Sequence, residues 1–355
     1  MNKTFILCDT PYQLFNGLNI IRSSPKVSFD LYIIDQFDSA KTVYDKISLE
    51  ENLNNVILIK RSDSKMINHI KDYTDYLMAK INFRKLIIKS KAPVDDFHYN
   101  NLFASVLTRE ACLMSFLNPQ SNFYLYDDGI GSYSGKITID TINPYKMKLY
   151  KLLHVGPPFV KIKGLYVNNV SMCRSKITSN IVSLPKISDE YLHYIRNIFG
   201  DSASIPNKKI IWLTQPNEMQ NDNIIVDNHV MNILKKYREE VCVRMHPRQT
   251  DKVRFEGFNL DNPNRLWELG ISDTRISDNV LIGMCSSAQL TPKLLFNNEP
   301  YLIFLYPCYK NGLSQAVVAK IEENIRILKQ SYSNPEKIRV VQEFEELDDI
   351  LSNWK

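Results

Sequence analysis

The amino-acid sequence predicts an α/β protein of two domains, each built around a mostly parallel sheet. Short apolar runs alternate with longer helical patterns along most of the 355 residues. This alternation is typical of parallel strands that helices cover on both faces. It stops in one polar stretch and then resumes, and the chain is longer than the roughly 250–300 residues that one core usually serves. We therefore expect domains at 1–155 and 206–355, joined by an irregular segment at 156–205.

The first predicted domain begins with a strand over "TFILC" and a helix over "YQLFNGLNIIRS". Thr10 and Pro11 suit the N-cap and the first position of this helix. The following elements, in order, are the strand "FDLYIID", a helix near 38–49, the strand "NVILIK", an amphipathic stretch from about 64 to 88, the short run "DDFHYN", a helix over "LFASVLTREACLMSF" and the strand "NFYLY".

The segment at 156–205 is rich in Pro, Ser and Asn, which favours turns over regular structure. After it the alternation resumes with the strand "KKIIWLTQP", the helix "NIIVDNHVMNILKKYR", the strands "EVCVRMHPR" and "DNVLIGMCSS", the helix "AQLTPKLLFN", the strand "EPYLIFLYP" and helices near 313–329 and 343–353. The two domains are therefore expected to be Rossmann-like and to face one another across a cleft.

Composition excludes several classes of protein. The net charge of +5 is modest, and no basic run interleaved with aromatic residues indicates a nucleic-acid partner. The six cysteines are scattered and form no CxxC pair, which favours a reducing compartment over a disulfide framework or a zinc site. The amino terminus lacks the apolar run of a signal peptide, and no stretch of about 20 apolar residues predicts a membrane span. The expected location is the cytoplasm.

Familiar nucleotide fingerprints are missing. Neither GxGxxG nor GxxxxGK[ST] occurs, so the usual dinucleotide and P-loop interpretations are disfavoured. A phosphate would have to be bound by other groups.

The stretch "FYLYDDGIGSY" places Asp127, Asp128 and Gly129 directly after a predicted strand. Open α/β sheets bind ligands beyond the carboxyl ends of their strands, where a carboxylate can act as a general base. The alternative is a polar turn that closes a core strand.

His246 and Pro247 follow a predicted strand of the second domain, and Arg244 and Arg248 flank them with positive charge. A histidine here could donate a hydrogen bond to a phosphate and help a leaving group depart. The alternative is a surface or packing role.

Two further candidates lie on the same side of the second domain. Ser286 and Ser287 fall where a helix begins, and helix amino termini bind phosphate through unpaired N–H groups. Asp222 lies in "LTQPNEMQNDN", just before a predicted helix. The alternative for Ser286, Ser287 and Asp222 alike is helix capping.

The chain resembles the bacterial sialyltransferases with the GT-B arrangement. It has the motifs Asp-Asp-Gly, His-Pro and Ser-Ser in this order on two Rossmann-like domains. The stretches "CDTPYQLFNG" and "LTQPNEMQNDN" are most similar to glycosyltransferase family 52, the lipooligosaccharide and capsule sialyltransferases. The resemblance consists of short motifs and spans both domains, from about residue 5 to about residue 300.

This resemblance implies that the second domain binds CMP-sialic acid. His246, with Pro247, would contact the phosphate of CMP, and Ser286 and Ser287 would hold the same phosphate. Trp267 and Glu268 would border the cytidine, and Arg244 would complement the anionic donor. No cofactor is implied, and no metal is required because these groups can stabilise the departing phosphate.

The catalytic base implied by the resemblance has two candidates. Related families use a carboxylate of the Asp-Asp-Gly motif, here Asp127 with support from Asp128 and Gly129, whereas family 52 places the base where Asp222 stands. The expected reaction is a single inverting displacement onto a hydroxyl of a terminal sugar, with galactose the first choice, on a bacterial surface glycan.

Several alternatives remain open at this point. The same fold would also fit another GT-B transferase with a different nucleotide sugar, a nucleotide-sugar epimerase or a non-catalytic subunit of capsule assembly. The expected partners are the donor and the glycan acceptor, with no nucleic acid. A homodimer and a peripheral association with the inner membrane are further expectations.

Overall fold

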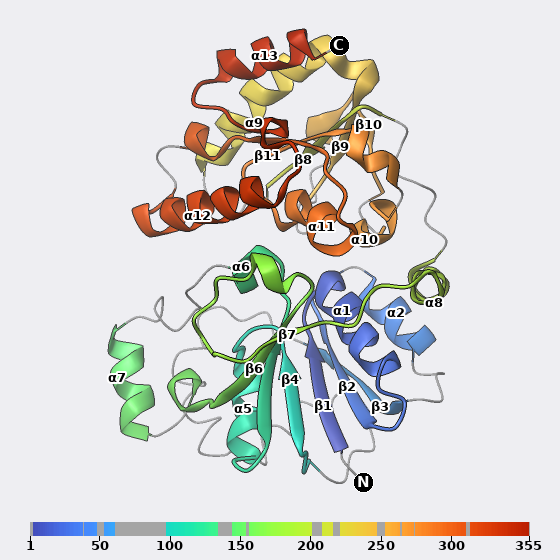
Figure 1. Cartoon of the computed structure of the whole chain (residues 1–355), viewed down its shortest axis with the longest axis vertical. Helices are drawn as coiled ribbons and strands as arrows, with labels where there is room; N and C mark the ends of the chain where they lie inside the picture. Colours follow the sequence, from blue (N-terminus) through green and yellow to red (C-terminus); the bar gives the residue numbers. More distant parts are fainter. Residues whose placement is uncertain are drawn as a thin grey trace. The chain divides into compact units, whose positions relative to one another are not determined.

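The computed structural model describes residues 3–37, 39–47, 53–60, 97–133, 144–153, 156–200, 208–215, 221–246, 253–262, 265–272, 274–309 and 313–354. The chain divides into two compact units, Met1–Ile198 and Phe199–Lys355. Each unit has its own parallel sheet, shown in Figure 1.

The first unit is built on a seven-stranded sheet in the order β3-β2-β1-β4-β5-β6-β7, and every strand pair is parallel. The strands are β1 Lys3–Cys8, β2 Ser28–Asp35, β3 Leu53–Lys60, β4 Asn101–Ala104, β5 Asn122–Tyr126, β6 Ile162–Val167 and β7 Ile181–Ser183. The chain moves outward from β1 in one direction to β3, and from β4 in the other direction to β7. The point between β1 and β4 is therefore the switch point at which such sheets bind ligands.

Helices flank this sheet, with α2 against β2 and β3 and α5 against β4 (Figure 1). The helices of the unit are α1 Pro11–Arg22, α2 Ala40–Ile47, α5 Arg109–Leu117, α6 Ile130–Tyr133, α7 Pro144–Leu153 and α8 Asp189–Phe199, with 3₁₀ turns η2 Pro157–Phe159 and η3 Val170–Met172. Thr10 caps α1, because its side chain accepts a hydrogen bond from the N–H of Gln13, and Pro11 occupies the first turn.

The second unit has a six-stranded parallel sheet in the order β10-β9-β8-β11-β12-β13. The strands are β8 Ile210–Leu213, β9 Val241–Arg244, β10 Asn259–Leu260, β11 Val280–Gly283, β12 Tyr301–Phe304 and β13 Ile338–Val340. Its switch point lies between β8 and β11.

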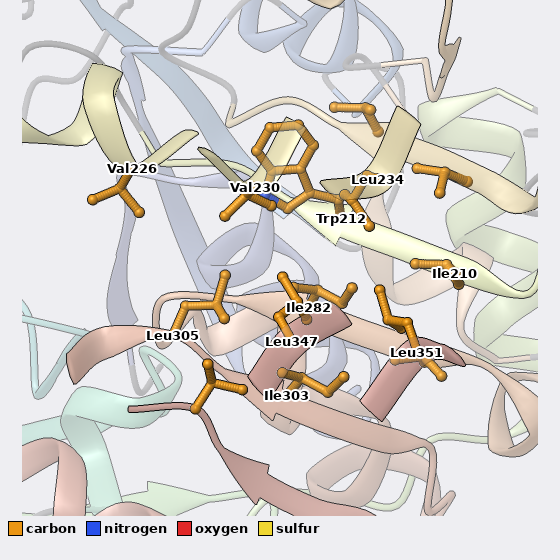
Figure 2. Close-up of a cluster of buried hydrophobic side chains, with 14 of the residues drawn as sticks. Ile210, Trp212, Val226, Val230, Leu234, Ile282, Ile303, Leu305, Leu347 and Leu351 are labelled. Carbon is orange, nitrogen blue, oxygen red and sulfur yellow. The ribbon is translucent and has the colours of Figure 1, made fainter. Parts of the chain in front are cut away.

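The helices of this unit are α9 Asn221–Leu234, α10 Trp267–Gly270, α11 Ser287–Phe296, α12 Gln315–Ser331 and α13 Phe344–Asn353, with 3₁₀ turns η5 Lys235–Glu240, η6 Val253–Phe255, η7 Thr274–Asp278, η8 Tyr306–Tyr309 and η9 Pro335–Lys337. Apolar side chains of α9 and α13 gather with those of β8, β11 and β12 into one core, as Figure 2 shows. Burial of these faces is the main force that fixes the helices on the sheet.

The predicted class, α/β with two mostly parallel sheets, is confirmed. Two local predictions were wrong. The segment at 156–205 is not a linker, because β6, β7 and α8 lie in it and the unit boundary falls at 198. The single helix predicted over "LFASVLTREACLMSF" is instead β4 followed by α5, since a run of three apolar residues has no period that separates strand from helix.

Some predictions fall outside the described residues, namely the amphipathic stretch at 64–88 and the positions Pro247 and Arg248. Among the helices that the structure describes, none has the length and apolar content needed to cross a bilayer.

Candidate active site

Polar residues follow three strands of the first sheet at its carboxyl edge. Asp9 follows β1, Asp127 follows β5 and Asn168 follows β6. Because parallel strands end at the same edge, their next residues lie on one side of the sheet.

Asp127 lies at the centre of this group and is fully buried. Its Oδ1 accepts a hydrogen bond from the N–H of Gly129 at 2.8 Å. Its Oδ2 accepts three hydrogen bonds, from the hydroxyl of Tyr133, from the backbone N–H of Asn168 at 3.1 Å and from Nδ2 of Asn168 at 3.0 Å. Gly129 has φ +84°, a backbone conformation that other residues rarely adopt, so the glycine makes this tight turn possible.

Burial raises the pKa of Asp127 above its usual value, although hydrogen bonds from Tyr133, Asn168 and Gly129 act in the opposite direction. Four donors occupy a carboxyl group that has no contact with solvent. In this structure, therefore, Asp127 holds the ends of β5 and β6 together, and its role as a general base stays a prediction.

Asp128 and Asp9 are both half-buried. The Nε2 of Gln13 donates to Oδ1 of Asp128 at 2.7 Å, and the Oε1 of Gln13 accepts the N–H of Asp9 at 2.6 Å. The buried amide of Gln13 thus joins the loops after β1 and β5 through the half-buried Asp9 and Asp128.

In the second unit the ends of three neighbouring strands are in register. Arg244 of β9 pairs with Leu213 of β8, and Leu213 pairs with Gly283 of β11. His246 therefore lies just beyond β9, and Ser286 lies just beyond β11, on either side of the end of β8. Two strand spacings separate these positions, about 10 Å.

Thr214 follows β8 between them, and its Oγ1 accepts the N–H of His246 at 3.0 Å. The backbone of the half-buried His246 is therefore fixed at the switch point of this sheet.

Ser286 is the N-cap of α11. Its hydroxyl accepts the N–H of Ala288 at 3.2 Å, and the side chain of Gln289 accepts the N–H of Ser286 at 3.0 Å, which completes a capping box. Gln289 is fully buried and donates to the carbonyls of Leu281 and Ile303, so it also ties the helix to β11 and β12. The helix amino terminus thus stands at the switch point with a fixed position, which suits an anion.

Arg244 belongs to a buried cluster. Its guanidinium pairs with Asp261, donates to the carbonyl of Arg265 at 2.8 Å and lies over the ring of Trp267 at 5.1 Å. Arg265 pairs with the same carboxylate at 3.0 Å, and its buried Nη1 has no hydrogen-bond partner. Two guanidinium groups therefore share one carboxylate, and this cluster carries excess positive charge beside the end of β9.

Trp267 is 5% exposed, and its Nε1 donates to the carbonyl of Ala288 and to Oγ1 of Thr291, both at 2.9 Å. Pro292 in α11 has no N–H to give to the carbonyl of Ala288, four residues earlier, so the indole and, at 3.3 Å, the hydroxyl of Thr291 donate to that carbonyl instead. Trp267 therefore ties α10 to α11, and its contact with cytidine stays a prediction.

Glu268 is also buried. Burial raises its pKa to about 7, while its own backbone N–H and the charge of Arg244 act to lower it. Asp222 is the second residue of α9, so its backbone lies in the first turn of the helix that follows β8.

The structure thus brings His246, Ser286 and Ser287 to the switch point of one sheet and places Arg244, Trp267 and Glu268 beside it. Asp127, Asp128 and Gly129 belong to the other unit. The motifs in the sequence did not indicate six further polar residues at these two edges, namely Asp9, Gln13, Asn168, Thr214, Asp261 and Arg265. Asp9, Asn168 and Thr214 directly follow strands, so the rule that singled out Asp127 could have found them.

No protein-family model matches the chain, and no curated protein is similar to it. Solved structures are similar over nearly the whole chain. The spinosyn rhamnosyltransferase SpnG has a TM-score of 0.53 and 8% identity, and the match covers 100% of this chain and 91% of that one. UGT89C1 of Arabidopsis thaliana, in complex with UDP-L-rhamnose, has a TM-score of 0.51 and 9% identity, with coverages of 99% and 90%.

The UDP-GlcNAc 2-epimerase of Methanocaldococcus jannaschii, in complex with UDP-GlcNAc and UDP, is similar with a TM-score of 0.50 and 11% identity, over 99% of this chain and 92% of that one. Identities this low establish the fold alone. The chain therefore has a fold of the GT-B type, with two Rossmann-like units, and this fold is found in transferases of sugars and in an epimerase of a nucleotide sugar.

Proposed function

We propose that the protein is a glycosyltransferase that uses a nucleotide sugar, and that this donor is CMP-sialic acid. The observation that carries the proposal is the carboxyl edge of the second sheet, where His246 and the amino terminus of α11 flank the end of β8. The GT-B type of fold agrees with a nucleotide-sugar enzyme, and the order of the short motifs favours sialic acid as the transferred sugar.

The donor phosphate would bind at the amino terminus of α11, where N–H groups and the hydroxyl of Ser287 can donate to it. His246 would donate to the same phosphate and stabilise the charge that develops as CMP leaves. The excess positive charge of Arg244 and Arg265 would complement the carboxylate or the phosphate of the donor.

The acceptor would be a hydroxyl of a terminal sugar, with galactose the first to be tested, on a bacterial surface glycan. A carboxylate takes the proton of this hydroxyl, the oxygen bonds to the anomeric carbon, and the bond from that carbon to the phosphate oxygen breaks. Asp222 is the favoured base because it belongs to the same unit as His246, whereas Asp127 is enclosed by four hydrogen-bond donors.

The donor class is tested by calorimetric titration of the protein with CMP, UMP, UDP and GDP in the presence of EDTA. Binding of CMP and not of the other three is expected. His246→Ala should weaken CMP binding at least about tenfold, since a charge-assisted hydrogen bond contributes about 1.5–3 kcal/mol. The matched control is His193→Ala, which changes an exposed histidine of the first unit and should leave CMP binding unchanged.

Each other outcome is equally informative. Binding of UDP without CMP would replace the sialic acid donor with another nucleotide sugar. Conversion of a nucleotide sugar in the absence of an acceptor would indicate an epimerase. Failure of all four nucleotides to bind would contradict the enzyme proposal and favour a non-catalytic subunit.

The base is tested by comparing kcat of Asp222→Asn, Asp127→Asn and Asp128→Asn with CMP-sialic acid and lactose. Asp222→Asn should lower kcat by about 10²–10⁴-fold with little change in the affinity for CMP. A similar selective loss in Asp128→Asn, with Asp222→Asn fully active, would move the base to the first unit.

A further inference from the structure

The positive charge of the chain is concentrated in one segment. The 48 residues from 141 to 188 contain eight Lys and Arg residues and no Asp or Glu. The other 36 of the 44 basic residues are outnumbered by the 39 acidic residues elsewhere. Removal of this segment would therefore reverse the sign of the net charge, and such asymmetry indicates an anionic partner.

Helix α7 lies in this segment, at the periphery of the first unit in Figure 1. Lys148, Lys151 and Leu152 are all exposed, and their spacing of three and four residues places them on one face of the helix. Leu152 is 74% exposed, so two lysines flank a large apolar side chain that the described fold leaves in solvent. Tyr150, on the other side of the helix, is buried.

The chain after α7 continues the same pattern. Phe159 is 41% exposed and Lys161 and Lys163 are exposed, at alternate positions along the end of η2 and the start of β6. All three line a hollow of about 580 Å³, together with Phe116 of α5, which is 45% exposed.

Helix α7 contacts η2, and Gly156 permits this contact because a Cβ at that position would meet the ring of Tyr150 at 2.7 Å. The two groups of side chains are thus on adjoining elements. We name the six exposed side chains Lys148, Lys151, Leu152, Phe159, Lys161 and Lys163 of these adjoining elements the basic face. Within the described ranges none of its four lysines forms an ion pair.

We propose that the basic face binds the surface of an anionic lipid bilayer. Lysines complement the negative charge of the lipid headgroups, and exposed Leu and Phe side chains can enter the boundary between headgroups and acyl chains. A soluble polyanion would use the lysines but would gain nothing from Leu152 and Phe159. The proposal concerns the first unit only and holds whichever nucleotide the second unit binds.

The test is co-sedimentation of the full chain with vesicles of phosphatidylcholine, with or without phosphatidylglycerol. The protein should sediment with the mixed vesicles, which contain phosphatidylglycerol, and not with vesicles of phosphatidylcholine alone. Binding should weaken as the salt concentration is raised. Lys148→Glu combined with Lys151→Glu should weaken binding to the mixed vesicles at least about tenfold. The matched control, Lys26→Glu with Lys329→Glu, makes the same change in net charge at exposed lysines outside the segment. Its affinity for the mixed vesicles should stay within about twofold of the wild-type affinity.

A second variant separates a bilayer from a soluble polyanion. Leu152→Ser should weaken binding to mixed vesicles severalfold and leave binding to heparin unchanged. All substituted side chains are exposed, and an unchanged unfolding temperature confirms the fold of each variant.

Three results would overturn the proposal. The first is that the Lys148/Lys151 double variant binds vesicles as well as the wild type does. The second is that the Lys26/Lys329 control loses as much vesicle binding as the Lys148/Lys151 variant. The third is that Leu152→Ser keeps full vesicle binding. The last result would assign the basic face to soluble polyanions.

Discussion

At the scale of the residue, Asp127 has a structural role that its hydrogen bonds make plain. Its four donors come from Gly129, Tyr133 and Asn168, and the last of these is 41 residues away in the sequence. The sequence could indicate that a carboxylate follows a strand, but not that a distant asparagine would enclose it.

Asp127→Asn is expected to destabilise the protein by about 2–4 kcal/mol, because the new NH₂ group must face at least one buried donor. Denaturation in urea measures this loss. Asp128→Asn is the control, since its remaining oxygen can still accept from Gln13, and it should cost less than about 1 kcal/mol. Equal, small losses would contradict the structural role of Asp127.

Glu268 links stability to pH. In the folded protein burial raises its pKa from 4.5 to about 7, so the folded state keeps a proton that the unfolded state releases between these values. The contribution of Glu268 to folding stability therefore falls as the pH rises through this range, by about 3 kcal/mol at most at about 1.4 kcal/mol per pH unit.

Glu268→Gln should flatten this dependence, so that the variant loses less stability than the wild type between about pH 5 and about pH 8. Urea midpoints at several pH values measure the difference. Parallel curves for the two proteins would show that Glu268 has an ordinary pKa.

At the scale of the element, α11 combines three features that place its amino terminus. The capping box of Ser286 and Gln289 fixes its first turn, and Gln289 ties it to two strands. Trp267 from α10 completes the hydrogen bonding that Pro292 interrupts. The helix itself was predicted from its pattern, but Trp267, the nearer of the two donors to that carbonyl, belongs to another element and could not be predicted.

Trp267 and Pro292 should therefore be coupled. Trp267→Phe leaves the carbonyl of Ala288 with a weaker partner and should cost about 1–3 kcal/mol. In the presence of Pro292→Ala, whose N–H can bond to that carbonyl, the same substitution should cost about 1 kcal/mol less. A double-mutant cycle of unfolding free energies measures the coupling, and strict additivity would contradict this account.

The elements that the sequence predicted best are β8, β9, β11 and β12 of the second unit, because each is a continuous apolar run between polar turns. Strands β4, β6, β7, β10 and β13 were missed, since the apolar runs there are short and polar residues or Pro surround them. In those places the pairing with neighbouring strands, and not the local pattern, decides the structure.

At the scale of the whole molecule, each unit has a separate sheet and core, so we expect two cooperative thermal transitions. Leu14 of α1 and Leu234 of α9 are both fully buried, one in each unit. Leu14→Ala and Leu234→Ala should each cost about 2–5 kcal/mol and lower only one of the two transitions. Calorimetric scans of both variants assign the transitions to their units.

CMP should then raise only the transition that Leu234→Ala lowers, because the proposed donor site lies in the second unit. A single transition that both substitutions shift equally would show that the units unfold together.

Two of the six free cysteines allow the opening of each unit to be followed without any substitution in the chain. Cys8 in β1 and Cys242 in β9 have no exposed surface, and burial raises the pKa of each thiol to about 12. An alkylating reagent can therefore modify either one only when its strand is released. The rates at which the two thiols are alkylated would time the opening of each unit separately, in one sample of the native protein.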